Sequence, residues 1–177
     1  KESSSASDVY KRQPFEQDLL RDRPHQRQEM FDAFKTALNE YAINNKNAYI
    51  VKDFINKKKV ILMATGSEVQ IALKASEVLE GKGIGTRVIS FPSWELFEEQ
   101  DNKYKKKILP RGTVRIAIEA GVRLGWEKWL YENGGNQTKA SFVGMSSFGA
   151  SAPVEDIFNH FQINIDEICR QAESLII

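Results

Sequence analysis

The sequence is poor in the residues from which many catalytic and metal sites are built. Its 177 residues include one cysteine, Cys169, and two histidines, His25 and His160. A single cysteine cannot form an internal disulfide, and there is no second thiol for a paired metal site. The nucleophile motif G-x-S-x-G is also missing. From its residue types we therefore predict no catalytic residue and no metal site in this chain.

Long apolar runs and a surplus of one charge are missing as well. No segment reaches the roughly 18 apolar residues of a membrane span, and the first residues lack the apolar core of a signal peptide. The 25 basic and 24 acidic residues leave a formal net charge of +1, whereas nucleic-acid-binding domains normally carry a basic surplus. We expect a cytoplasmic protein with neither a membrane nor a nucleic acid as its partner.

The first 45 residues differ in pattern from the rest. Residues 1–13 are polar, rich in serine and without periodicity, as a tag or a joining segment would be. Residues 28–41 place apolar side chains at helical spacing, which predicts one amphipathic helix. We interpret residues 1–45 as a partly disordered head and residues 46–177 as a separate domain.

Strand and helix patterns alternate through the second part. Its last helix starts at Asn164 and places Cys169 on an apolar stripe, which favours a small core residue. Short apolar runs separated by helical segments predict a three-layer α/β/α fold with a mostly parallel, five-stranded sheet. A short turn joins the first run to the second, so we expect the first to be an antiparallel edge strand. The predicted strands are residues 48–52, 60–64, 86–91, 113–118 and 141–145, and the predicted helices include residues 67–80 and 154–161.

Thr65, Gly66 and Ser67 form a corner between a buried strand and a helix. In open α/β sheets ligands bind beyond the carboxyl ends of the strands, and free N–H groups at a helix start can hold an anion. The corner lacks the glycine pattern of a pyrophosphate loop. A capping box between Ser67 and Gln70 would also use two of those donors. Both interpretations stay open: an anion site at residues 65–67, or a helix cap alone.

A second glycine group, residues 81–85 ("GKGIG"), follows a helix and precedes a strand. A phosphate cradle needs the opposite order, because its N–H groups belong to the start of a helix. We therefore interpret Gly81 or Gly83 as the cap that ends the helix.

Four blocks of sequence are more particular than a general α/β pattern. They are "ATGSEVQIALKA", "RVISFPSWELFEEQ", "EAGVRLGWEKW" and "SFGASAPVEDIF", and they occur in this order. Together they resemble the C-terminal domain of transketolases over about residues 48–177. Related domains of deoxyxylulose-phosphate synthase and of the pyruvate dehydrogenase β subunit are less similar to these blocks.

The resemblance implies a parent enzyme that moves two-carbon ketol units between sugar phosphates in the pentose phosphate pathway. It implies thiamine diphosphate with Mg²⁺ or Ca²⁺ as cofactors, held by other domains of a homodimer. This chain contains no Gly-Asp-Gly motif of the kind that holds the metal and diphosphate. The resemblance therefore carries no catalytic and no cofactor-binding residue onto this chain, and it implies that the fragment is inactive by itself.

The same resemblance suggests what the strand-end loops do. Trp94, Glu119, Trp126 and Phe148 all follow, or end, predicted strands on one side of the sheet. We expect them to contact the remaining transketolase domains or the second subunit. Two other interpretations are kept: a stand-alone phosphate- or nucleotide-binding module, and a purely structural dimer contact.

Overall fold

We describe the fold from a computed structural model, in which residues 48–131 and 139–176 are described. The described residues form five strands and six helices. In chain order these are β1 (Tyr49–Lys52), β2 (Lys58–Ala64), α3 (Glu68–Gly81), β3 (Gly85–Ser90), α4 (Trp94–Glu98), α5 (Asn102–Ile108), β4 (Val114–Val122), α6 (Glu127–Leu130), β5 (Ala140–Met145), α7 (Val154–His160) and α8 (Ile165–Ile176).

The strands form one five-stranded sheet in the order β1-β3-β2-β4-β5. β2 is parallel to both of its neighbours, β3 and β4, and β5 is parallel to β4. Only β1 is antiparallel, and it pairs with β3 at one edge of the sheet. The predicted fold class is confirmed, including the antiparallel edge strand.

Side chains of the central strand alternate between two apolar clusters. Val60, Leu62 and Ala64 belong to the first cluster, whereas Ile61 and Met63 belong to the second. This alternation follows from the two-residue period of a strand, and it makes β2 buried on both faces. The continuous apolar run in the sequence therefore corresponds to the centre of the sheet.

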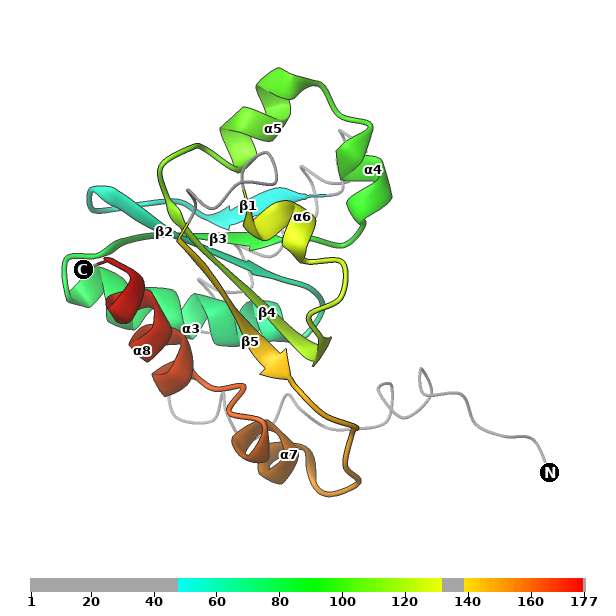
Figure 1. The fold of residues 1–177 in the computed structure, drawn as a ribbon. Helices are drawn as coiled ribbons and strands as arrows, with labels where there is room; N and C mark the ends of the chain where they lie inside the picture. The colour runs from blue at the N-terminus through cyan, green and yellow to red at the C-terminus, as the bar shows by residue number, and fades with distance from the viewer. Residues whose placement is uncertain (1–47, 132–138, 177) are drawn as a thin grey trace, which may run out of the picture. The chain divides into compact units, whose positions relative to one another are not determined.

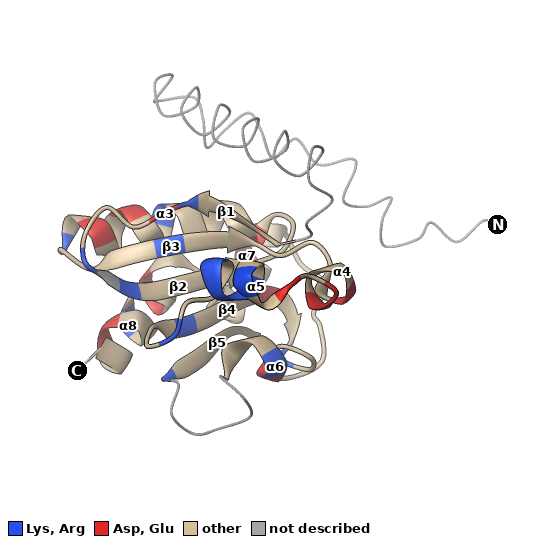
Figure 2. Ribbon diagram, turned by 90° about the horizontal axis from the view of Figure 1, so that it is seen from above, with Lys and Arg blue, Asp and Glu red and all other residues tan. Residues whose placement is uncertain are grey.

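Different helices cover the two faces of the sheet (Figure 1). α3 and α8 supply the helical side chains of the first cluster, and α4, α5 and α6 supply those of the second. In Figure 2, basic residues gather along α5 and acidic residues at α4. The sequence pattern predicted α3, α7 and α8, but it did not delimit the three short helices of the other layer.

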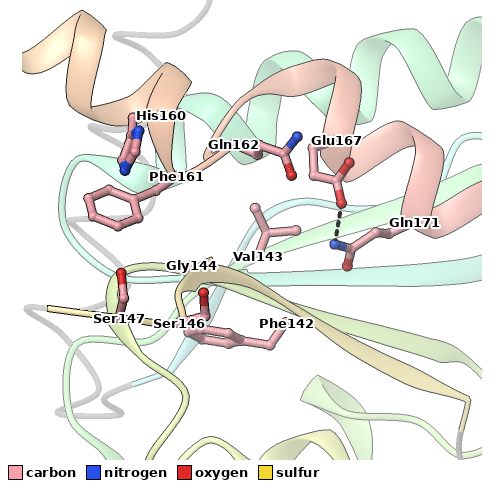
Figure 3. Close-up of a pocket in the computed structure, with 10 residues that line it drawn as sticks. All are labelled: Phe142, Val143, Gly144, Ser146, Ser147, His160, Phe161, Gln162, Glu167 and Gln171. Atoms are coloured by element: carbon pink, nitrogen blue, oxygen red, sulfur yellow. Dashed lines mark hydrogen bonds between the residues drawn. The ribbon is translucent and has the colours of Figure 1, made fainter. Parts of the chain in front are cut away.

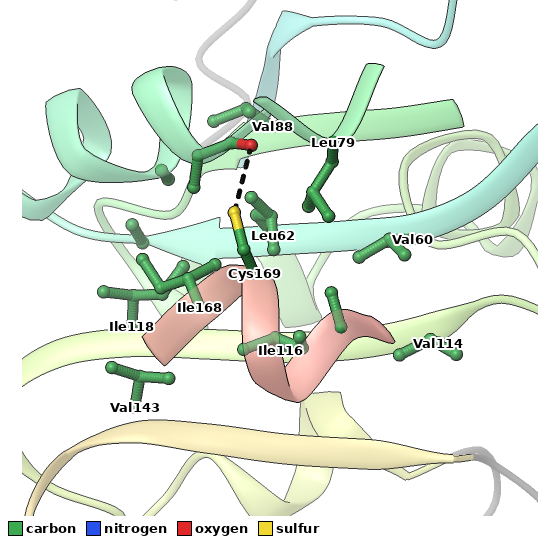
Figure 4. Close-up of a cluster of buried hydrophobic side chains, with 14 of the residues drawn as sticks. Val60, Leu62, Leu79, Val88, Val114, Ile116, Ile118, Val143, Ile168 and Cys169 are labelled. Carbon is green, nitrogen blue, oxygen red and sulfur yellow. Dashed lines mark hydrogen bonds between the residues drawn. The ribbon is translucent and has the colours of Figure 1, made fainter. Parts of the chain in front are cut away.

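The last helix has the predicted amphipathic face. Ile168, Cys169 and Ala172 are buried against the sheet. The Cys169 thiol lies in the apolar cluster, 3.7 Å from the carbonyl oxygen of Ala75 (Figure 4). Asn164 caps the helix, because its side-chain oxygen accepts a 3.0 Å hydrogen bond from the N–H of Glu167. The prediction that Cys169 is a small core residue is confirmed.

Gly83 ends α3 in the way that the sequence predicted. It has a φ of +75°, its N–H donates to the carbonyl of Glu80, and the N–H of Ile84 donates to the carbonyl of Leu79. These two bonds are those of a Schellman motif, which needs a left-handed residue at this place. Gly83 is therefore the helix-ending glycine, and a phosphate loop is not formed here.

The side chain of Glu80 ties the end of α3 to two strand connections. Its carboxylate accepts hydrogen bonds from the N–H groups of Ile55 (3.1 Å), Asn56 (3.0 Å) and Thr86 (2.6 Å), and from the Asn56 amide (2.7 Å). Burial acts to raise the pKa of Glu80, but these donors outweigh it and hold the pKa below its ordinary value. Glu80 thus fixes the turn before β2 and the start of β3.

The predicted helix at residues 28–41, and the whole head of residues 1–45, lie outside the described residues. The boundary between head and domain therefore stays a prediction. Within residues 48–131 and 139–176, no helix has both the length and the apolar character needed to cross a lipid bilayer.

Candidate functional site

The carboxyl edge of the sheet brings two of the predicted site residues together. Thr65 directly follows β2, and Glu119 lies near the end of the neighbouring strand β4. The Thr65 hydroxyl donates a 2.5 Å hydrogen bond to the carboxylate of Glu119. Because parallel strands end at the same edge, residues 54 positions apart in the chain become direct neighbours.

The helix start at Ser67 differs from the predicted capping box. Ser67 has helical backbone angles, and its side chain makes no capping hydrogen bond to the helix. Its hydroxyl donates instead to the carboxylate of Glu68, at 3.3 Å, while its carbonyl accepts from the N–H of Gln70. The capping-box prediction was wrong, because Ser67 already has helical backbone angles, whereas a residue whose side chain caps a helix is normally extended.

A buried carboxylate stands at this helix start. Glu68 is only 4% exposed. Burial raises the pKa of Glu68; its own N–H and that of Ala120 oppose this rise, while the charge of Glu119 adds to it. A phosphate at this corner would face the carboxylates of Glu68 and Glu119. The geometry therefore favours a hydrogen-bond donor, or a proton on one of the carboxylates, over an anion. Anion binding at residues 65–67 stays a prediction, which titration with inorganic phosphate tests.

The two predicted tryptophans have different surroundings. Trp126 is 1% exposed, so it lies inside the second apolar cluster and offers no surface to a partner. Trp94 is half-buried and packs edge-on against Trp126, with ring centroids 5.2 Å apart. Gly125 lies beneath Trp94: a Cβ added to Gly125 would be 2.3 Å from the Trp94 ring. Trp126 thus supports Trp94, and Trp94 closes the cluster at the carboxyl edge.

Three large apolar side chains are exposed where β4 and β5 end. Phe148 is 98% exposed, Leu124 is 82% exposed and Val122 is 56% exposed. Val122 pairs with Met145 at the end of β5, which places the ends of the two strands side by side. Phe148 was predicted from the sequence, whereas Val122 and Leu124 were not. The block "GVRLGW", with two apolar residues beyond a buried strand, was the signal that could have found them.

The fold and the carboxyl edge of the sheet define the class of protein to which this domain belongs. The described residues form a three-layer α/β domain whose carboxyl edge presents carboxylates and exposed apolar side chains. Among residues 48–131 and 139–176 there is no group of three or more His, Cys, Asp or Glu side chains that could hold a metal ion.

Comparison with known proteins names the family. A family model described as "Transketolase-like TK C-terminal domain" matches residues 47–164. The chain therefore belongs to the family of transketolase C-terminal domains.

Individual relatives agree with the family model. The chain is 50% identical over 131 residues to a transketolase of Rhodobacter capsulatus, covering 74% of this chain and 20% of that protein. It is 46% identical over 134 residues to a chloroplastic transketolase of Craterostigma plantagineum, covering 74% of this chain and 25% of that protein. The structure of a transketolase from Leishmania mexicana superimposes with a TM-score of 0.65 at 36% identity, covering 73% of this chain and 18% of that chain.

The matches cover most of this chain but only a small part of each relative. The chain spans about a fifth to a quarter of the length of these curated relatives. The alternative of a stand-alone phosphate- or nucleotide-binding module is not supported by any of these matches.

Proposed function

We propose that this chain is the C-terminal part of a transketolase that moves two-carbon ketol units between sugar phosphates. The observation that carries the proposal is the 50% identity to the Rhodobacter capsulatus transketolase over 131 residues. In this proposal the parent protein is a homodimer that uses thiamine diphosphate and a divalent metal.

The described residues do not fit the cofactor. A diphosphate needs cationic or N–H partners, but Glu68 and Glu119 occupy the edge at which α/β sheets bind such groups. We therefore assign no step of ketol transfer to this chain. Its role in the proposal is to support the domains that carry the chemistry.

The supporting surface that we propose is the carboxyl edge of the sheet. Its contact residues are Trp94, Glu119 and Phe148 from the sequence analysis, with Val122 and Leu124 added from the structure. An aromatic side chain that is 98% exposed is costly to leave in water, because burying a phenylalanine is worth about 1.5–3 kcal/mol. Phe148 is thus the strongest anchor for neighbouring polypeptide, and Trp126 acts beneath the surface by supporting Trp94.

A chimeric enzyme tests this role. Residues 47–177 would replace the matching region of the Rhodobacter capsulatus transketolase, and ketol transfer would be measured with sugar phosphates. We expect an active chimera, and no activity from the 177-residue chain alone. Transfer by the isolated chain would overturn the proposal, and so would a folded chimera without activity.

A substitution in the chimera tests the proposed surface separately. Phe148→Ser should lower the stability of the assembled enzyme and raise the fraction of dissociated or partly unfolded protein, as measured by analytical ultracentrifugation. Leu96→Ser, at another exposed apolar residue, is the control and should have little effect. Equal effects of the two substitutions would argue against a specific anchor at Phe148.

The cytoplasmic location stays part of the proposal. The relatives from Craterostigma plantagineum and Zea mays are described as chloroplastic, so the compartment follows the organism. Fractionation of the source cells, with detection of this chain, tests it.

A further inference from the structure

A pocket lies beside the loop that carries the proposed contact residue Phe148, and Ser146 and Ser147 of that loop form part of its lining. It lies between the end of β5 and the corner that joins α7 to α8 (Figure 3), and its volume is about 240 Å³. This volume equals about eight water molecules at roughly 30 Å³ each. The pocket is therefore large enough for a small organic molecule of five or six carbons.

One wall of the pocket is held rigid by hydrogen bonds. Glu167 is fixed by the Asn164 cap and accepts hydrogen bonds from Arg170 at 2.7 Å and from the amide of Gln171 at 2.6 Å. The Gln171 oxygen in turn accepts a hydrogen bond from the Ser141 hydroxyl of β5. This network sets the orientation of the Glu167 and Gln171 side chains toward the pocket (Figure 3).

Other polar groups that line the pocket are available to a ligand. They are the hydroxyl of Ser146, the imidazole of His160 and the amide of Gln162. Within the described part of the chain, no hydrogen bond uses any of these three side chains. Together they offer both donors and acceptors, since a serine hydroxyl, a neutral imidazole and an amide each carry both. Phe142 and Phe161 also line the pocket, but most of its surface is polar.

The charge of the lining restricts the ligand. No lysine or arginine lines the pocket, and its fixed charge is the carboxylate of Glu167, which Arg170 neutralises from outside. The hydrogen bond from Arg170 is the main cause that holds the pKa of Glu167 below its ordinary value, against the effect of burial. A phosphate or carboxylate would find no lysine or arginine in the lining with which to pair. The lining thus disfavours anions and suits an uncharged molecule with several hydroxyl groups.

We propose that this pocket binds a small uncharged polyhydroxy compound, such as a free sugar or a polyol without phosphate. Donors and acceptors on the same lining side chains match the hydroxyl groups of such a compound, and the mainly polar lining suits it better than an apolar ligand. The proposal does not rest on the proposed function, because it concerns this chain alone.

Titration of the ¹⁵N-labelled 177-residue chain tests the proposal, with glucose and glucose 6-phosphate as a pair that differs in one phosphate. We expect saturable amide shifts at Gly144, Gln162 and Gln171 with glucose, with a dissociation constant of about 1–10 mM. The phosphate ester should bind at least about fivefold more weakly. No saturation by about 100 mM glucose would overturn the proposal. Tighter binding of the phosphate ester would also overturn it.

A substitution at the rim of the pocket distinguishes an effect on ligand binding from an effect on folding. Gln162 has a φ of +56°, a conformation that glycine adopts without strain, so Gln162→Gly removes the amide and relaxes the backbone. We expect a folded protein that binds glucose about fivefold more weakly, and Ser146→Ala should weaken binding in the same direction. Glu77→Gln, on the exposed side of α3, is the control and should leave binding unchanged. Unchanged binding in both pocket variants would contradict the proposal.

Discussion

The N–H of Thr86 donates a 2.6 Å hydrogen bond to the carboxylate of Glu80, which joins the start of β3 to the last turn of α3. Glu80→Ala would leave the N–H groups of Thr86, Ile55 and Asn56 without this acceptor. A buried donor without a partner costs about 1–3 kcal/mol, so we expect the free energy of unfolding to fall by at least about 2 kcal/mol. Urea unfolding at pH 7 measures the change. Glu77→Ala, exposed on the same helix, is the control and should change stability by less than about 0.5 kcal/mol.

The same carboxylate predicts a pH dependence. The pKa of Glu80 is lower in the folded chain than its ordinary value of 4.5, because its N–H donors outweigh burial. The ionised group therefore contributes its full stabilisation above the unfolded pKa, and this contribution is lost as the pH falls through the folded pKa. The stability difference between the wild type and Glu80→Ala should shrink when urea unfolding is repeated below pH 4.5. A difference that stays constant from pH 7 to pH 3 would contradict this assignment.

The carboxylates of Glu68 and Glu119 at the carboxyl edge predict a pH dependence of stability of the opposite sign. Burial raises the pKa of Glu68, and the nearby charge of Glu119 adds to the rise. Ionising Glu68 therefore costs stability, a cost that appears as the pH rises from 4.5 through the raised pKa. Glu68→Gln removes one charge but keeps an acceptor, so it should stabilise the chain at pH 7.5 by about 0.5 kcal/mol, the scale of a like-charge pair. Thermal unfolding at pH 7.5 and pH 4 tests this, and the gain should vanish at pH 4.

The sheet core allows a sharper comparison within one strand. Ile116 in the middle of β4 is fully buried, whereas Val122 at the end of the same strand is exposed. An unpaired carboxylate in the core costs several kcal/mol, a large part of a total stability of about 5–15 kcal/mol. Ile116→Asp should therefore abolish folding, as judged by circular dichroism, and Val122→Asp should fold. A folded Ile116→Asp protein would show that β4 is not central to the core.

Some of this architecture could be predicted because its signals are local. The run at residues 60–64 is apolar at every position, as a strand buried on both faces requires, and Gly83 follows directly on a helix. Asn164 with Glu167 gave a correct cap, whereas Ser67 with Gln70 gave a wrong one, although both pairs have the same spacing. The difference lies in the backbone: Ser67 has helical angles instead of the extended angles of a capping residue, and sequence spacing does not report that.

Other features depend on contacts between distant segments. The partner of β1 is β3 and not the next strand in the chain, because the turn after β1 is tied to Glu80 rather than closed as a hairpin. Trp126 follows a strand as Trp94 does, yet one ring is buried and the other covers it. The pocket beside β5 is formed by residues from four segments, so no stretch of sequence could predict it.

The head of the chain gives a prediction that follows from the sequence alone. Residues 1–45 lack the pattern of the domain, so they should contribute little to its stability. Deleting them should change the melting temperature of the remaining chain by less than about 4 °C, which for a domain of this size corresponds to roughly 1 kcal/mol. Differential scanning calorimetry of both forms measures the difference. A large drop would show that the head packs on the domain.

Two glycines with left-handed backbone angles allow the stability cost of backbone strain to be distinguished from that of a side-chain clash. Gly112 has a φ of +70° and no atom within 4 Å of an added Cβ, whereas Gly125 has a φ of +91° and the ring of Trp94 at 2.3 Å. Gly112→Ala should cost about 1–2 kcal/mol, the penalty of the left-handed conformation. Gly125→Ala should cost a further 1–3 kcal/mol or so, because the methyl group must displace Trp94 from Trp126. Urea unfolding measures both costs, and tryptophan emission should shift to longer wavelength only in Gly125→Ala. Equal costs and unchanged emission would show that Trp94 moves aside freely, and the proposed contact surface would then lack a fixed tryptophan.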